Sequence, residues 1–171
     1  QIYTKAELKE TSGSITKIAF KQANATTVTR NLVVYMKNTD KETFGGVYDW
    51  DALTEANKVF EGNVALPGTD KDLEIVLDTP FEYDGAKNLL IAVQDNTGSS
   101  IGPARFYKYD VPDRSIRAVD YSNPFGIGSR DLVPINLHQL VLNGICHLFT
   151  HLFSSLDRIW CCLLNALCHC I

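Results

Sequence analysis

The chain has 171 residues, with 16 lysine and arginine and 20 aspartate and glutamate side chains, and a formal net charge of −4 at pH 7. Its charges form no cluster of either sign, which excludes the electrostatic surface that binds nucleic acid or an anionic membrane. All five cysteines and all four histidines lie beyond residue 137, so the preceding residues lack the base for a Ser-His or Cys-His catalytic pair.

The composition changes at residue 132. Residues 132–171 contain 25 apolar side chains and only two charges, Asp157 and Arg158. About 130 residues can bury one core without metal or disulfides. We therefore predict one domain over residues 1–131, a junction over 132–136 and an apolar tail over 137–171. Because the chain opens on QIYTKAEL without methionine or a leader, we expect that its true N-terminus lies upstream or that a leader has been removed.

Seven short apolar or alternating runs follow one another along the predicted domain, and each predicts a strand. They are SITKIAF (14–20), RNLVVYMK (30–37), VFEGNVAL (59–66), LEIVLDT (73–79), NLLIAVQD (88–95), ARFYKYD (104–110) and SIRAVDY (115–121). Segments rich in Gly, Pro, Asn, Asp and Ser separate them, as turns do. Only TEANKVF (54–60) predicts a helical turn.

This spacing of strands and turns predicts an all-β fold, an antiparallel β-sandwich of jelly-roll-like type, followed by the atypical tail. Side chains at alternate positions of a strand share one face. On that basis we predict the following inward-facing residues: Leu32, Val34, Leu73, Ile75, Leu77, Leu89, Ile91 and Val93.

Several segments carry a resemblance to a known class of module. They are QIYTKAEL, SITKIAF, TRNLVVYMKNTDKETF, DW, ANKVFEGNV, LDTPFEYDGAKNLLIAVQDNTGS and SIRAVDYSNP, in that order over residues 1–124. Together they resemble a β-sandwich module of Bacteroidetes secreted and surface proteins that often lies beside fibronectin type III domains. That module is similar to the cleaved-adhesin, or gingipain adhesin, jelly rolls.

The resemblance implies a non-catalytic binding or adhesion module at the cell surface or in the secreted space. It names no ligand, and it fades into FGIGSRDLVPINLHQL, where a closing strand of the family is either degenerate or lost. We expect carbohydrate or an extracellular protein as the partner, together with neighbouring domains of a longer chain.

The segment YDWDALTE (48–55) contains acidic residues that suggest catalysis and aromatic residues that suggest sugar binding. Asp49, Asp51 and Glu55 offer the carboxylate pair of a glycoside hydrolase, and a solvated acidic loop is the alternative. Aromatic rings can instead hold the apolar face of a sugar. The predicted ligand-binding residues are Tyr48, Trp50, Tyr107 and Tyr109, the last two on one face of a strand opposite Phe106. The alternative for Tyr107 and Tyr109 is ordinary packing on a half-exposed sheet, and for Trp50 it is a plug in the core or at its rim.

Calcium is the one cofactor with candidate ligands in the predicted domain, because hard cations bind carboxylate and carbonyl oxygens of loops. The candidates are Asp95, Asn96, Asp110 and Asp113, and their spacing does not fit an EF-hand. The alternative is that these side chains accept hydrogen bonds from backbone amides of turns.

The tail ends in CCLLNALCHCI (161–171), whose cysteine spacing matches no standard zinc site. His147 and His151 are four residues apart near Cys146, but the surrounding period of apolar residues predicts a helix that is apolar on most faces. Such a helix packs on the domain, contacts a membrane or drives association. We predict that it binds no metal and is dispensable for ligand binding. A shifted reading frame and a genuine fused helical hairpin both explain the change in composition.

Three functions remain open. The predicted function is non-catalytic binding at the cell surface or in the secreted space. A glycoside hydrolase that uses the carboxylates of YDWD, and a structural spacer between domains, are the alternatives.

Overall fold

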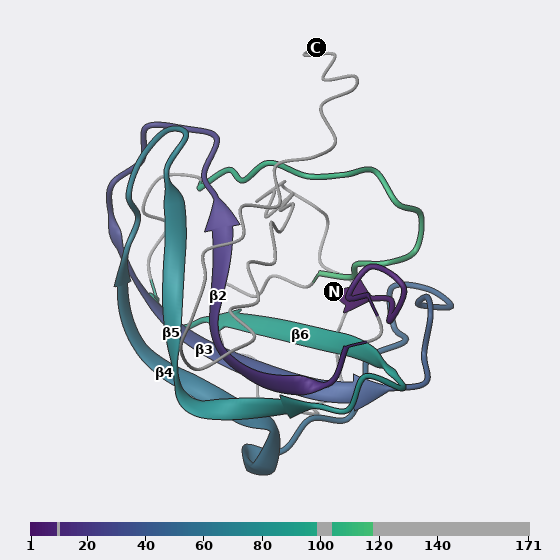
Figure 1. The fold of residues 1–171 in the computed structure, drawn as a ribbon. Helices are drawn as coiled ribbons and strands as arrows, with labels where there is room; N and C mark the ends of the chain where they lie inside the picture. The colour runs from purple at the N-terminus through teal and green to yellow at the C-terminus, as the bar shows by residue number, and fades with distance from the viewer. Residues whose placement is uncertain (10, 99–103, 118–171) are drawn as a thin grey trace.

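The structure is a computed structural model that describes residues 1–9, 11–98 and 104–117 (Figure 1). The described residues form two antiparallel sheets. The first sheet has the strand order β1-β6-β3-β4, and the second pairs β2 with β5. The strands are β1 (Ile2–Tyr3), β2 (Gly13–Lys21), β3 (Thr29–Thr39), β4 (Lys58–Ala65), β5 (Asp72–Tyr83) and β6 (Asn88–Asp95). Five of the seven predicted strands are thereby confirmed.

The predicted helical turn is also confirmed, as the 3-10 helix η1 (Glu55–Asn57). The side chain of Asn57 folds back to its start, where its Oδ1 accepts a hydrogen bond of 3.0 Å from the Thr54 amide. No helix within the described ranges is long and apolar enough to cross a membrane.

The second sheet contains an irregularity that the sequence did not reveal. Ile15 pairs with Phe81 but Lys17 pairs with Val76, so β5 has extra residues opposite a single residue of β2. Pro80 lies in this stretch. Proline has no amide hydrogen to donate, and here the regular hydrogen bonding between β2 and β5 is already interrupted. The predicted end of the strand LEIVLDT at Thr79 was therefore wrong, and the strand continues to Tyr83.

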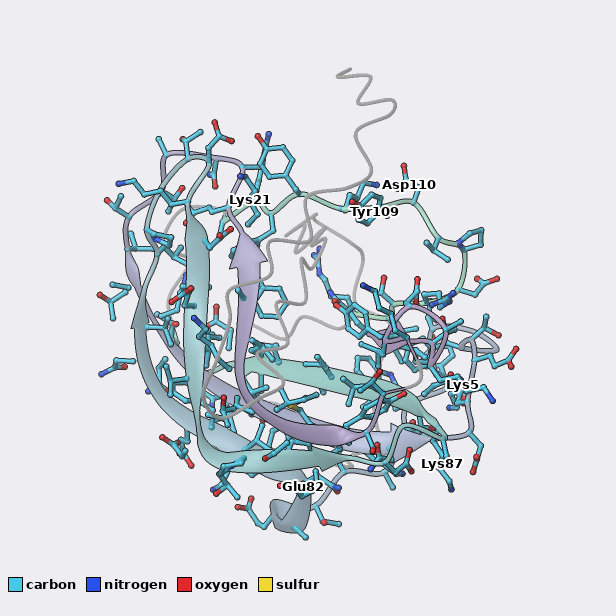
Figure 2. All side chains as sticks on the ribbon, viewed as in Figure 1. Lys5, Lys21, Glu82, Lys87, Tyr109 and Asp110 are labelled. Carbon is cyan, nitrogen blue, oxygen red and sulfur yellow. The ribbon has the colours of Figure 1, made fainter. Side chains whose placement is uncertain are left out.

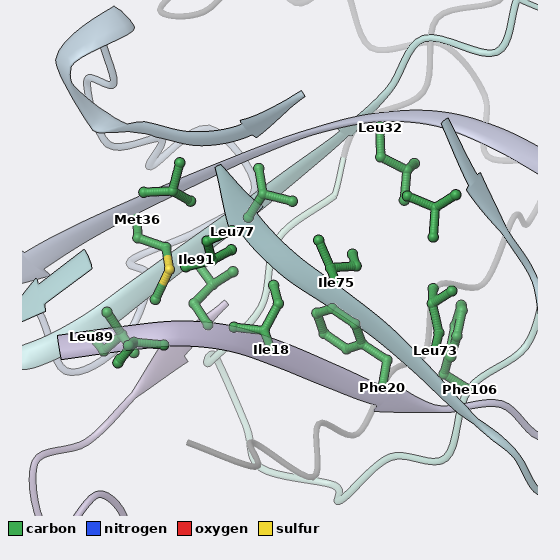
Figure 3. Close-up of a cluster of buried hydrophobic side chains, with 14 of the residues drawn as sticks. Ile18, Phe20, Leu32, Met36, Leu73, Ile75, Leu77, Leu89, Ile91 and Phe106 are labelled. Carbon is green, nitrogen blue, oxygen red and sulfur yellow. The ribbon is translucent and has the colours of Figure 1, made fainter. Parts of the chain in front are cut away.

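The core lies between the two sheets and takes side chains from β2, β3, β4, β5 and β6 (Figure 3). Its buried residues are Ile15, Ile18, Phe20, Leu32, Val34, Met36, Val59, Val64, Leu66, Leu73, Ile75, Leu77, Tyr83, Leu89, Ile91, Ala104 and Phe106. The sheets also meet where β4 contacts β5, and there the Glu61 amide donates a hydrogen bond of 2.9 Å to the Asp78 carboxylate.

Seven of the eight predicted inward residues are buried, and Val93 is the exception at 37% exposed. Alternation along β6 assigns Val93 to the face of Leu89 and Ile91. However, alternation does not tell whether a second layer covers that position. In the described part of the chain, the second sheet has two strands against the four of the first.

A second, smaller apolar cluster lies on the other face of the four-stranded sheet. Ile2, Phe44 and Leu90 are its buried members, with Leu53 and Ile116 packed against them. Leu90 alternates with Leu89, so β6 is covered on both faces at this end. The cluster holds two non-strand segments against the sheet: residues 40–54, which we call the aromatic loop, and residues 104–117, which we call the strap.

The strap covers one predicted strand, over 104–110, and the first three residues of another, over 115–121. Its only strand-type contact among the described residues is an isolated bridge between Phe106 and Gln22, so the strand predicted over 104–110 was wrong. Residues 115–117 are also not in a strand, and the rest of SIRAVDY lies outside the described residues. The predicted domain end at 131, the junction and the tail lie outside them as well.

Candidate functional site

Large apolar side chains that are exposed gather in two places. The described residues include eight of them, and six lie at positions 47–50 of the aromatic loop and 107–111 of the strap. The six are Val47, Tyr48, Trp50, Tyr107, Tyr109 and Val111, and the other two are Val76 and Val93. All four aromatic residues predicted to bind ligand are among the six. An exposed apolar group of this kind on loops is typical of a binding surface.

A single lysine holds the aromatic loop together. The Lys41 ammonium group donates hydrogen bonds to the Asp49 carboxylate at 2.8 Å and to the Asp49 carbonyl oxygen at 3.2 Å. It also lies 3.7 Å from the Asp51 carboxylate. These contacts hold the backbone of Asp49 and the side chains of both aspartates on either side of Trp50, which is 42% exposed.

Asp49 closes the loop on itself. Its second carboxylate oxygen accepts a hydrogen bond of 2.7 Å from the Gly45 amide, and its own amide donates to the Gly46 carbonyl oxygen at 3.1 Å. The Gly45 amide and then the Lys41 ammonium group stabilise the ionised form, so the pKa of Asp49 lies below its ordinary value. The carboxylate is therefore a structural acceptor that keeps its charge at neutral pH.

The base of the aromatic loop is anchored in the smaller apolar cluster. Phe44 is buried against Ile2 and Leu90, and the Lys41 ammonium group lies 5.4 Å from the centre of the Phe44 ring. The Phe44 amide donates a hydrogen bond of 2.7 Å to the Asp113 carbonyl oxygen of the strap. The aromatic loop and the strap are therefore joined at their bases.

The strap is tied at both ends and exposed between them. At its start, the Phe106 ring packs edge-on against Phe20 at 6.1 Å, and the Tyr107 amide donates to the Lys21 carbonyl oxygen. At its end, the Arg114 carbonyl oxygen accepts a hydrogen bond of 2.9 Å from the Ile2 amide, and the Arg114 guanidinium contacts Glu7 at 2.6 Å.

Tyr107 and Tyr109 differ in their surroundings. The Tyr107 hydroxyl donates a hydrogen bond to the Asp70 carboxylate, so this side chain already has a structural contact. Tyr109 is 70% exposed, and Figure 2 shows it with Asp110 on the part of the strap that arches away from the strands. The shared strand face predicted for the two tyrosines is not formed, because no strand forms here.

The carboxylates proposed for glycoside hydrolysis all pair with lysine. Asp49 and Asp51 share Lys41, and Glu55 lies 2.7 Å from Lys58. A glycosidase acid needs a raised pKa in order to hold its proton, whereas the pKa of Asp49 is lowered. This geometry favours the structural interpretation of the acidic loop. One oxygen of Asp51, Oδ2, is buried without a hydrogen-bond partner.

The calcium candidates take part in local interactions of the kind that turns make. Asp95 accepts a hydrogen bond of 3.0 Å from the Thr97 amide and lies 3.2 Å from Arg30. The Asn96 side-chain oxygen accepts one of 2.9 Å from Gln94. Asp110 pairs with Lys108 at 2.6 Å. Asp113 has a positive φ of 57°, typical of a turn. Among the residues placed in space, no three or more His, Cys, Asp or Glu side chains form a group that could hold a metal.

Gln22 is a structural residue that the sequence analysis missed. It is fully buried, and its side-chain nitrogen donates to the carbonyl oxygens of Asn24 at 2.8 Å and Thr26 at 2.6 Å. Its side-chain oxygen accepts a hydrogen bond of 3.1 Å from the Gly68 amide. Gln22 thus joins two turns beneath the start of the strap. A single glutamine in FKQAN has no local sequence signal for this role.

The fold and the surface define a protein of two antiparallel sheets that displays aromatic side chains on two joined loop segments. Comparison of the chain with protein-family models, with curated proteins and with solved structures gives no match. The resemblance to the adhesin-like modules of Bacteroidetes therefore stays a prediction from the sequence.

Proposed function

We propose that this protein is a non-catalytic binding module of jelly-roll-like, adhesin-like type that works at the cell surface or in the secreted space. Its ligand is a carbohydrate or an extracellular protein, held by Tyr48 and Trp50 of the aromatic loop and by Tyr109 of the strap, with Tyr107 at the edge of the surface. The observation that carries the proposal is the gathering of six of the eight exposed large apolar side chains on these two segments.

The rigidity of the aromatic loop supports a binding role. A ligand that meets a loop already held in shape does not bear the entropy cost of ordering it, which increases affinity. Lys41, Asp49 and the buried Phe44 hold the segment on both sides of Tyr48 and Trp50. The aromatic rings then offer large contact areas at a low entropy cost.

The glycoside hydrolase is the second candidate function, because Asp49 and Asp51 lie on either side of an exposed tryptophan. The lysine pairing of both carboxylates weighs against it, since a general acid must carry a proton. A structural spacer between domains is the third, and it gives no reason for exposed aromatic residues.

One experiment separates the three functions. The full chain is applied to a glycan array and a panel of matrix proteins, and is assayed on a panel of glycosidase substrates. We expect a ligand without turnover, and a loss of about 2 kcal/mol of binding free energy, roughly thirtyfold in Kd, for Trp50→Ala. Val76→Ala, an exposed valine on β5, is the matched control and keeps full affinity.

Two results would overturn the proposal. Turnover that Asp49→Ala or Asp51→Ala abolishes would establish the hydrolase. No ligand and no turnover in either panel would favour the spacer.

A further inference from the structure

We propose that Lys41 is a positioning residue for Trp50: it sets the exposure and orientation of the ring without touching the ligand. The inference rests on the proposed function for its biological meaning, because Trp50 is a binding residue only there. Its test requires no ligand.

Both neighbours of Trp50 are charged, and they share one cation. Trp50 lies between Asp49 and Asp51 in the chain, and both carboxylates converge on the Lys41 ammonium group, at 2.8 Å and 3.7 Å. Lys41 itself is held at its backbone, where its carbonyl oxygen accepts a hydrogen bond of 3.0 Å from the Asn88 side chain at the start of β6. The lysine therefore connects both neighbours of Trp50 to the four-stranded sheet.

Removal of the Lys41 charge would be unfavourable for Asp51. The Asp51 side chain is only 17% exposed, and its Oδ2 is buried without a hydrogen-bond partner. A buried carboxylate that loses its cation is strongly unfavourable, so it turns toward water when its surroundings permit. Because Asp51 directly follows Trp50, this movement carries the tryptophan with it.

No regular secondary structure fixes the position of Trp50. Residues 40–54 contain no strand or helix in the structure, and the 3-10 helix begins at Glu55. Besides the contacts of Lys41, the Gly45–Asp49 hydrogen bond and the packing of Phe44 and Leu53 hold the segment, and the Lys37 ammonium group donates to the Ala52 carbonyl oxygen at 3.4 Å. Of all these, the contacts of Lys41 alone engage the residues directly before and directly after the tryptophan.

The experiment measures acrylamide quenching of Trp50 fluorescence in the full chain. The protein has two tryptophans, so Trp160→Phe is introduced into every variant to leave Trp50 as the only emitter. Since Trp50 is already 42% exposed, full exposure raises the quenching constant by about twofold at most. We expect Lys41→Met to move the constant toward that limit.

Two further variants separate positioning from general destabilisation. Lys41→Arg keeps a cation and should return the quenching constant most of the way to the parent value. The double variant Lys41→Met with Asp51→Asn should also recover, because it leaves no buried charge that needs water. Lys17→Met is the matched control: it removes a lysine of similar exposure to Lys41, paired with Glu74 at 2.9 Å in the second sheet, and should leave Trp50 unchanged.

The proposal is overturned if folded Lys41→Met protein quenches like the parent, or if the double variant quenches as much as Lys41→Met alone. If circular dichroism and the melting curve show that Lys41→Met does not fold, the quenching constant of Trp50 is measured in Asp49→Asn instead. It removes a charged partner of Lys41 at an exposed position, and an unchanged quenching constant in it would refute the proposal. A failure of the proposed function has another signature: Trp50→Ala then binds its ligand as the parent does, whatever the quenching shows.

Discussion

Lys41, Asp49 and Asp51 are half-buried residues that shape the surface of this protein. Isolated surface ion pairs contribute little to stability. Here, however, one ammonium group contacts two carboxylates and a backbone carbonyl oxygen on either side of an exposed tryptophan. The pairs therefore act on the conformation of one loop, and we expect their loss to change ligand binding more than the melting temperature.

The pH dependence of the aromatic loop follows from Asp49. Its pKa is lowered, so its carboxylate stabilises the loop above the ordinary aspartate pKa of about 4, and the effect is lost as the pH falls through the lowered value. We expect an NMR titration of the Asp49 carboxyl group with a midpoint below 3.8, accompanied by increased quenching of Trp50. The Asp49→Asn variant should lack this transition. A midpoint at or above 3.8 would show that the Gly45 and Lys41 contacts do not form.

At the scale of the elements, the strands were the predictable part. Leu73, Ile75 and Leu77 alternate with polar residues in β5, and all three are buried as predicted. The strap was not predictable in this way. Its run ARFYKYD has the alternation of a strand. A segment becomes a strand, however, only where a neighbouring strand offers a free edge for backbone hydrogen bonds. Tertiary contacts decide this, and the local sequence does not contain them.

The roles of Lys41 and Gln22 could not be predicted for a related reason. YDWD drew attention to the carboxylates, and their partner lies eight and ten residues earlier, in a segment without periodicity. Gln22 is buried by turns that come from residues 24–26 and 68–70. By contrast, the exposure of Tyr48 and Trp50 follows from their position in a turn-rich segment, which is why those candidates could be chosen from the sequence.

At this scale we predict different costs for two residues of the predicted inward face. Ile75→Ala should reduce the free energy of unfolding by about 2–5 kcal/mol, because it opens a cavity between the sheets. Val93→Ala should cost less than about 1 kcal/mol, since its side chain is already partly in water. Urea denaturation of both variants measures the difference. Equal losses of unfolding free energy would mean that Val93 is buried in solution. The second sheet would then extend beyond its two described strands.

At the scale of the whole molecule, the two described sheets precede a segment, residues 132–171, whose composition differs from that of the rest of the chain. The proposed binding residues all lie within residues 48–109, on loops anchored by the four-stranded sheet and by β2. Because the proposed binding residues all precede residue 110, we expect that residues 132–171 contribute nothing to ligand recognition.

A chain that ends at Asp131 tests this expectation. We predict that it binds the ligand with the Kd of the full chain, and that the full chain holds no stoichiometric zinc under reducing conditions. Metal analysis, melting curves and binding isotherms of both lengths measure this. Zinc that is lost with Cys168→Ser or His151→Ala would contradict the prediction. A loss of cooperative unfolding in the shorter chain would instead show that the tail completes the domain.

The central claim is that ligand is bound by the aromatic loop and the strap, and the most direct measurement is an amide NMR titration of the full chain. Its ligand is the one that the glycan array and protein panel select. We predict shifts that concentrate at residues 45–51 and 107–111, with those around Val76 on β5 unchanged. Shifts confined to β5, or spread evenly over both sheets, would contradict the account.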